Sequence, residues 1–125
     1  MTKKFFVTFF AILLLNISTC AAEDLKFINS NDEYGYFVDI DTFKTVSPTI
    51  FDINMIIIRL NLNQMDVVDL QINHGEKNYT LRSTHTLSYD ERTEIKFDNT
   101  PRIAKGYSDK SLMGDIVRIV IYGGE

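Results

Sequence analysis

Cysteine is almost absent from this sequence, since Cys20 is the single one among 125 residues. One cysteine excludes an intrachain disulfide, so a folded domain must be held together by its hydrophobic core. Proline is also scarce, occurring only at Pro48 and Pro101, and glycine is scattered rather than clustered. No flexible or proline-rich linker therefore divides the chain. Together with the length, this composition predicts a single domain with one core.

Catalytic and metal-binding patterns are missing as well. The sequence contains no Gly-x-Ser-x-Gly motif and no glycine-rich phosphate loop. Its two histidines, His74 and His85, are not set beside a fixed carboxylate and make a weak metal signal. Asp39 and Asp41 share one side of a predicted strand, but without a second catalytic group they fit a strand end that enters a turn. We predict no enzymatic activity, no metal and no cofactor; an enzyme would need Asp39 or His85 to converge in a concave pocket.

Positive charge is in deficit, with 13 basic against 17 acidic residues and a formal net charge of −4. Without residues 1–22, which contain Lys3 and Lys4, the remainder of the chain is more acidic still. An acidic domain is repelled by phosphate backbones and anionic lipid surfaces. We therefore expect no nucleic-acid partner.

The N-terminal residues have the pattern of a bacterial export signal. Lys3 and Lys4 precede an apolar run over residues 5–15, and small residues follow over 18–22. The run is too short for a transmembrane helix, and no other segment could span a bilayer. Cleavage after Ala22 would leave one domain over residues 23–125, in the periplasm or at the cell surface. Lipidation of Cys20 is the alternative, but Thr19 is unusual before a lipidated cysteine, which favours release.

Residues 50–62 are the stretch around which the rest of the chain is organised. β-branched isoleucines dominate it, and such side chains fit a pleated sheet better than a helix. Phe51, Ile53 and Met55 share one parity, whereas Ile56 and Ile58 have the other. The pattern predicts a central strand that is covered on both faces.

Shorter runs elsewhere alternate in the same way and predict further strands at residues 25–28, 34–40, 68–72, 79–89 and 95–97. We expect residues 41–45 to form a turn or a single helical turn. A hairpin turn is expected at 73–76, where Gly75 could adopt a positive φ. Along 79–89 the strict alternation places Tyr79, Leu81, His85 and Leu87 on one face. Consecutive strands with short connections predict an antiparallel meander.

The C-terminal segment fits two structures. Ser108 could cap a helix with an apolar stripe of Leu112, Ile116, Ile119 and Val120. However, residues 116–122 are mostly β-branched and lie between glycines, which favours a strand on propensity alone.

Three short motifs resemble the surface-adhesin protein E-like domains of bacterial cell envelopes. They are Tyr-Phe-Val-Asp at residues 36–39, Leu-Ser-Tyr-Asp-Glu at 87–91 followed by Ile95, and Ser-Leu at 111–112 followed by Ile116 and Val120. The resemblance implies an α+β fold in which a C-terminal helix packs on one face of a single curved antiparallel sheet of about six strands. That family ties the helix to the sheet by a disulfide and has a tryptophan in its first strand.

The corresponding stretches here differ from the family. Residues near Ile72 and Ile121 are apolar, so hydrophobic packing would have to replace the disulfide, and Phe27 stands in for the tryptophan. The resemblance implies an exported, adhesin-like, non-catalytic domain that binds an unknown macromolecule, expected to be a protein. The alternative is a periplasmic accessory or enzyme-inhibitor protein that makes protein–protein contact through the loop residues Asn73, His74, Glu76 and Lys77. The oligomeric state is left open.

Overall fold

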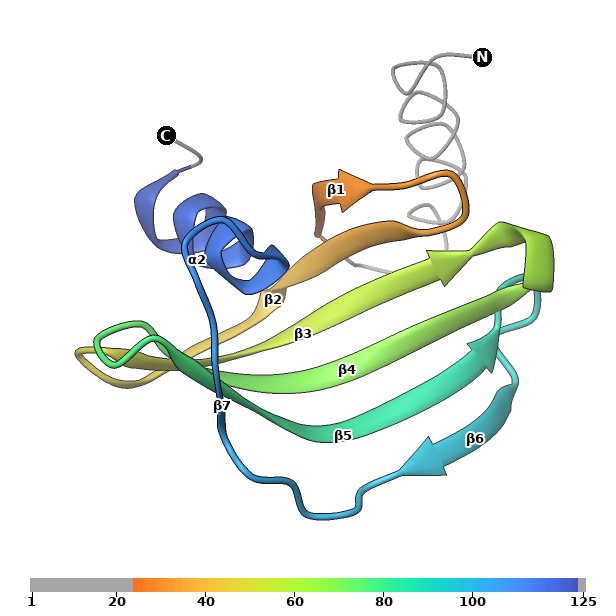
Figure 1. Cartoon of the computed structure of the whole chain (residues 1–125). Helices are drawn as coiled ribbons and strands as arrows, with labels where there is room; N and C mark the ends of the chain where they lie inside the picture. The colour runs from red at the N-terminus through yellow and green to blue at the C-terminus, as the bar shows by residue number, and fades with distance from the viewer. Residues whose placement is uncertain (1–23, 124–125) are drawn as a thin grey trace.

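The computed structural model describes residues 24–123, which form an antiparallel sheet and one C-terminal helix (Figure 1). The strands are β1 (Leu25–Ser30), β2 (Gly35–Ser47), β3 (Ile50–Arg59), β4 (Gln64–Asn73), β5 (Asn78–Ser88), β6 (Glu94–Asp98) and β7 (Lys105–Gly106). A short 3-10 helix, η1 (Leu60–Leu62), joins β3 to β4, and α2 (Leu112–Tyr122) follows β7. The predicted export signal and Cys20 lie outside the described residues.

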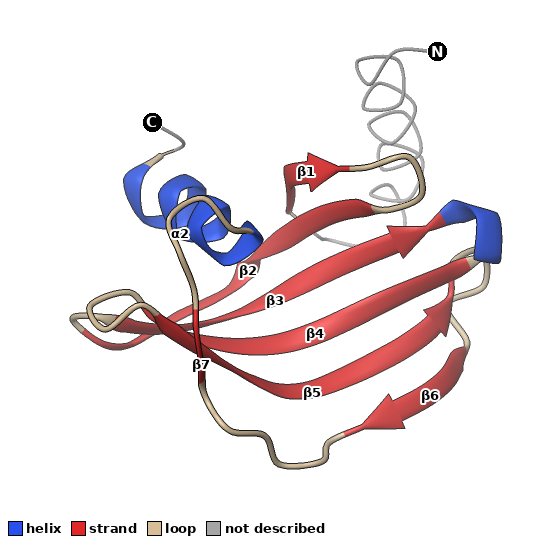
Figure 2. Ribbon diagram, viewed as in Figure 1, coloured by secondary structure: helices blue, strands red, loops and turns tan. Residues whose placement is uncertain are grey.

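The sheet is a meander. Strands β1 to β6 lie side by side in sequence order, each antiparallel to the next, and the two-residue β7 pairs with the start of β5. Figure 2 shows the strands as one open, bent layer. The expected α+β class and antiparallel sheet are therefore confirmed. No helix in residues 24–123 is long and apolar enough to cross a membrane.

Strand β3 is central, and both of its faces are buried, as the sequence predicts. Ile53 and Met55 are 1% and 4% exposed on one face, and Ile56 and Ile58 are 4% and 0% exposed on the other. We call these the Ile53 face and the Asn54 face, because Asn54 has the same parity as Ile56. An unpaired apolar face would be costly in water, so each needs its own cover.

The buried residues form two clusters, so the expected single core is divided by the sheet. The larger one lies on the Ile53 face and combines Val38, Ile53 and Leu70 with Met113, Ile116 and Val117 of α2. The smaller one lies on the Asn54 face and is made of Phe37, Ile56, Ile58 and Met65, with Phe27, Leu87 and Tyr89 packed against it. It occupies only one end of the Asn54 face, because Asp52 and Asn54 interrupt the apolar pattern at the other.

The turn expected at residues 41–45 is wrong, because β2 continues to Ser47. Its pairing with β3 is irregular between Asp39 and Lys44. There the Thr42 hydroxyl donates to the Asp39 carbonyl (2.7 Å) and accepts the Asn54 backbone N–H (2.8 Å). A side chain thus replaces the missing ladder bond, which lets a polar segment stay in the sheet.

The strict alternation expected along residues 79–89 is also wrong, because β5 contains a bulge. Leu70 pairs with Leu81 and Asp69 with Ser83, so Arg82 is an extra residue. The bulge changes the parity of the strand. Leu81 packs against the larger cluster, whereas Leu87 packs against the smaller cluster on the opposite face.

The C-terminal segment is a helix, with Ser111 rather than Ser108 as its N-cap. The Ser111 hydroxyl accepts the Gly114 N–H at 3.3 Å, and Gly123 ends the helix at φ 72°. The buried residues are Met113, Gly114, Ile116 and Val117, and Leu112 and Val120 pack against the same cluster. Of the expected stripe, only Ile119 lies outside the core. Capping and packing outweigh the β propensity of this segment.

Candidate functional site

A depression of about 330 Å³ lies on the polar end of the Asn54 face. Its polar side chains come from successive strands: Thr42 and Lys44 of β2, Asp52 and Asn54 of β3, Asp69 of β4, and Arg82, Ser83 and His85 of β5. Its volume is at the small end of the range for ligand sites, about 300 to 1,000 Å³. We treat this depression as the candidate site.

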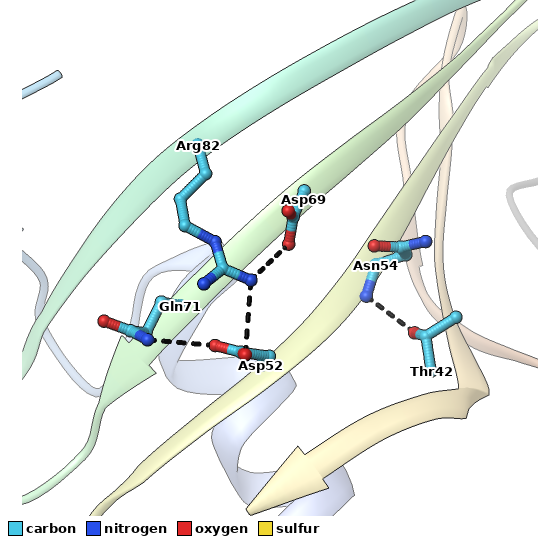
Figure 3. Close-up of polar contacts among 6 residues, drawn as sticks. All are labelled: Thr42, Asp52, Asn54, Asp69, Gln71 and Arg82. Atoms are coloured by element: carbon cyan, nitrogen blue, oxygen red, sulfur yellow. Dashed lines mark hydrogen bonds and ion pairs between the residues drawn. The ribbon is translucent and has the colours of Figure 1, made fainter. Parts of the chain in front are cut away.

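Arg82 is the central residue of the depression (Figure 3). Its Nη2 lies 2.9 Å from Asp69 Oδ1 and 3.2 Å from Asp52 Oδ2, so one guanidinium bridges β4 and β3. Gln71 Nε2 donates to the other Asp52 oxygen at 3.1 Å. The hydrogen bond to Asp69 is the main cause that raises the pKa of the Arg82 guanidinium. The bulge supplies this residue to the site, because Arg82 has no partner in the β4 ladder.

The opposite wall of the depression is the irregular part of β2. The Thr42 hydrogen bonds to Asp39 and Asn54 fix this segment beside β3, as Figure 3 shows for the contact between Thr42 and Asn54. Lys44 then lies opposite Asp52 in the register. Within the described residues, the Lys44 ammonium makes no hydrogen bond or ion pair. The wall therefore offers one free cation beside a carboxylate that is already engaged.

An aromatic pair forms the rim on the β6 side. The His85 ring stacks on Phe97 with centroids 4.3 Å apart, and its Nδ1 lies 2.5 Å from Glu94 Oε1. Phe97 is 47% exposed although it is a large apolar side chain. The rim thus presents an aromatic surface to solvent at the edge of a polar depression.

The arrangement is suited to hydrogen bonding. Asp39 and His85 are the two residues that the sequence offered for catalysis. His85 lines the depression but Asp39 does not, so the two side chains do not converge there. Asp39 Oδ1 instead accepts the Asp41 N–H at 3.1 Å, and burial raises the pKa of the Asp39 carboxyl. Among residues 24–123 no group of three or more His, Cys, Asp or Glu side chains could hold a metal ion.

The loop predicted as a partner contact lies at the end of β4, away from the depression. Asn73 Oδ1 accepts the N–H groups of Gly75 and Glu76 at 3.1 and 3.0 Å. His74 donates its N–H to the Thr49 carbonyl at 2.9 Å, and its ring lies 6.1 Å from that of Phe51. His74 and His85 therefore belong to different parts of the sheet.

Lys77 completes this loop and ties it to the segment before α2. Its Nζ lies 3.0 Å from Asp109 Oδ2, and its carbonyl accepts the Tyr107 N–H at 3.0 Å. The expected positive φ at Gly75 is wrong; Lys77 has it instead, at 56°. The loop is thus fixed from both sides by hydrogen bonds.

Sequence reasoning missed Arg82, Asp52 and Asp69 as a group. A signal was present, because Asp52 and Asn54 break the apolar pattern of β3 on the same side as Asp69 and Gln71 in the paired β4. Polar residues that share one parity on neighbouring strands indicate an open polar patch. Arg82 gives no such signal, since only the bulge brings it to that side.

Comparisons with protein-family models, with curated proteins and with solved structures gave no match to this chain.

Proposed function

We propose that this protein is an exported, adhesin-like and non-catalytic binding domain of the bacterial cell envelope, and that it holds a macromolecular partner on the polar end of its Asn54 face. The observation that carries the proposal is the depression around Arg82, where charged and polar groups from four strands are gathered and Arg82 is fixed by two carboxylates. Preorganised polar groups on a rigid sheet lose little entropy on binding.

We infer that α2 packs on the Ile53 face and leaves this part of the Asn54 face open. The buried α2 residues Met113, Ile116 and Val117 share a cluster with the Ile53 face only. The side chains of Arg82 and Asp69 are 40% and 36% exposed. In this arrangement one face builds the domain and the other is available to a partner.

Export and the family resemblance remain part of the proposal. They rest on the pattern of residues 1–22 and on the short motifs near residues 36, 87 and 111. Release of the protein by osmotic shock, compared for the natural sequence and a Cys20→Ala variant, tests export and anchoring. Release of both forms supports an exported protein without a lipid anchor, retention abolished by Cys20→Ala establishes an anchor, and cytoplasmic location of both contradicts export.

A binding assay with envelope fragments from cells that lack the protein tests the site. Arg82→Ala and Lys44→Ala each remove one cation of the depression, and we expect at least one of them to weaken binding about fivefold or more. Arg102→Ala is the matched control, because Arg102 is similarly exposed (43%) and pairs with Asp98 outside the depression. Lys44 has no partner within the described residues, so its loss leaves the fold intact even if Arg82→Ala does not.

The accessory or inhibitor function is the second candidate, and the fixing of the loop at residues 73–77 favours it. Inhibitory loops bind well when they are held in one conformation beforehand. In the same assay this function predicts loss of binding in Glu76→Ala or Lys77→Ala and none in the Arg82 and Lys44 variants. Binding that no variant changes would contradict both proposals.

A further inference from the structure

We infer that the group held in the depression is a neutral saccharide. The inference rests on the proposed function and names the chemistry of the ligand at the same site. It follows from the charge balance of the lining, from the polar groups left free there, and from the aromatic rim.

The charges of the lining compensate one another. Lys44 and Arg82 are cationic, and Asp52 and Asp69 are anionic. Arg82 lies within 3.2 Å of both carboxylates, so no strong field of one sign remains to attract a phosphate or a metal cation. Lys44 is the one cation of the lining without a partner in the described residues, and a single exposed ammonium attracts an anion only weakly. The site therefore favours a ligand that is polar and uncharged.

The free groups of the depression both donate and accept. Within the described residues, the Asn54 side-chain amide and the Ser83 hydroxyl make no hydrogen bond, although both line the depression. Of the two Asp69 oxygens, only Oδ1 contacts Arg82. An amide and a hydroxyl each offer a donor and an acceptor, which matches the hydroxyl groups of a sugar ring.

The rim offers the apolar contact that a sugar ring also needs. Phe97 is stacked on His85, which lines the depression, and it remains 47% exposed. The face of a pyranose that carries C–H groups is apolar, whereas its edge carries hydroxyls. A ring lying against Phe97 would direct its hydroxyls toward Ser83 and Asn54, since Ser83 precedes His85 by two residues on the same side of β5.

A printed array of neutral, anionic and cationic glycans, probed with the purified full chain, tests the inference. We expect binding to neutral glycans, followed in solution by saturation-transfer NMR with the free oligosaccharide. Asn54→Ala and Ser83→Ala should each weaken that binding about five- to tenfold, as the loss of one or two hydrogen bonds predicts. Ser47→Ala is the control for Ser83, because it lies at the far end of β2.

The aromatic rim has its own variant. Phe97→Ala should weaken glycan binding, whereas Ile103→Ala should not, although Ile103 is an even more exposed apolar residue at 88%. Both positions are exposed, so both variants are expected to fold.

The remaining outcomes separate this inference from the proposed function. Binding confined to anionic or cationic glycans overturns the neutral-ligand inference. Absence of all glycan binding, while envelope binding still depends on Lys44 or Arg82, overturns the saccharide and identifies a protein partner instead. If the protein binds neither glycans nor envelope fragments, the proposed function is overturned together with the saccharide inference.

Discussion

At the scale of the residue, the best-buried charge in the described chain is Asp66, which is 6% exposed. Arg59 Nη1 lies 2.7 Å from one of its oxygens, and the Thr86 hydroxyl donates to the other at 2.9 Å. The guanidinium of Arg59 also lies over the Tyr34 ring, 4.9 Å from its centroid. This pair joins the end of β3 to β4 and β5 and is distinct from the open network around Arg82.

Removing Arg59 should therefore destabilise the fold more than removing an exposed arginine. Arg59→Met leaves Asp66 without its cation, and we expect a loss of about 2 to 3 kcal/mol in the free energy of unfolding measured with urea. Arg102→Met, which breaks an exposed pair, should cost about 0 to 1 kcal/mol. Equal losses in the two variants would show that the Asp66 pair contributes no more than a surface pair.

Asp39 predicts a pH effect of known sign. Burial raises the pKa of its carboxyl above 3.8, so the folded protein keeps this proton to higher pH than the unfolded chain. The contribution of Asp39 to stability is thus full below pH 3.8 and is lost as the pH rises through the folded pKa. Asp39→Asn keeps an oxygen for the Asp41 N–H.

We expect Asp39→Asn to raise the urea midpoint at pH 7, and the gain to vanish below about pH 3.8. Asp41→Asn, at an exposed position on the same strand, is the comparison and should give a smaller gain, because it removes only the repulsion between the two carboxylates and leaves the burial of Asp39 unchanged. If the urea midpoint of Asp39→Asn exceeded that of the natural protein by more at low pH than at pH 7, the expected effect of the Asp39 carboxyl would be contradicted.

At the scale of the element, α2 depends on a glycine that a helix would not ordinarily favour. A Cβ on Gly114 would lie 2.4 Å from the Asp109 carbonyl oxygen and 2.6 Å from that of Ser108. Both are backbone atoms of the segment that leads into the helix, so they cannot rotate away.

Gly114→Ala should therefore destabilise the protein by about 1 to 3 kcal/mol, although alanine is the better helix former. Thermal unfolding followed by circular dichroism measures the effect. Gly106→Ala is the control, because its Cβ would meet nothing closer than 3.8 Å. If Gly114→Ala raised the melting temperature, the close approach of residues 108–109 to α2 would be wrong.

The elements themselves could be predicted largely from the sequence, and the exceptions have local causes. Alternating apolar residues located the strands, and the parity change within residues 50–62 identified β3 as covered on both faces. The bulge at Arg82 could not be predicted, since neither glycine nor proline marks it. For the same reason Arg82 was absent from the expected site, whereas Asp52 and Asp69 could have been recognised from their shared parity. The continuation of β2 depends on a hydrogen bond from Asn54 to Thr42, which no short-range pattern reveals.

At the scale of the whole molecule, two clusters share one sheet. Ile53 and Ile58 are 1% and 0% exposed in the larger and smaller cluster, yet both belong to β3. A strand common to both clusters should make them unfold together, because unpairing of β3 removes buried residues from both clusters at once.

Ile53→Ala and Ile58→Ala should each cost about 2 to 5 kcal/mol and retain a single unfolding transition. Tyrosine fluorescence and far-ultraviolet circular dichroism, measured in parallel in urea, should give the same midpoint for each variant. Separate transitions would mean that the clusters are independent. Since Cys20 is the sole cysteine, a reducing agent should leave every midpoint unchanged.

The position of α2 in the sequence also determines the order in which the parts of the fold can form. The last helix of the described chain contacts β1, the first strand, and supplies buried residues to the larger cluster. Neighbouring strands of the meander can pair as soon as they emerge from the ribosome, since each hairpin is local. Val38 and Leu70 remain without the residues of α2, however, until synthesis has reached position 117. The smaller cluster, which contains no residue of α2, can therefore pack before the larger one, and the larger one is completed late.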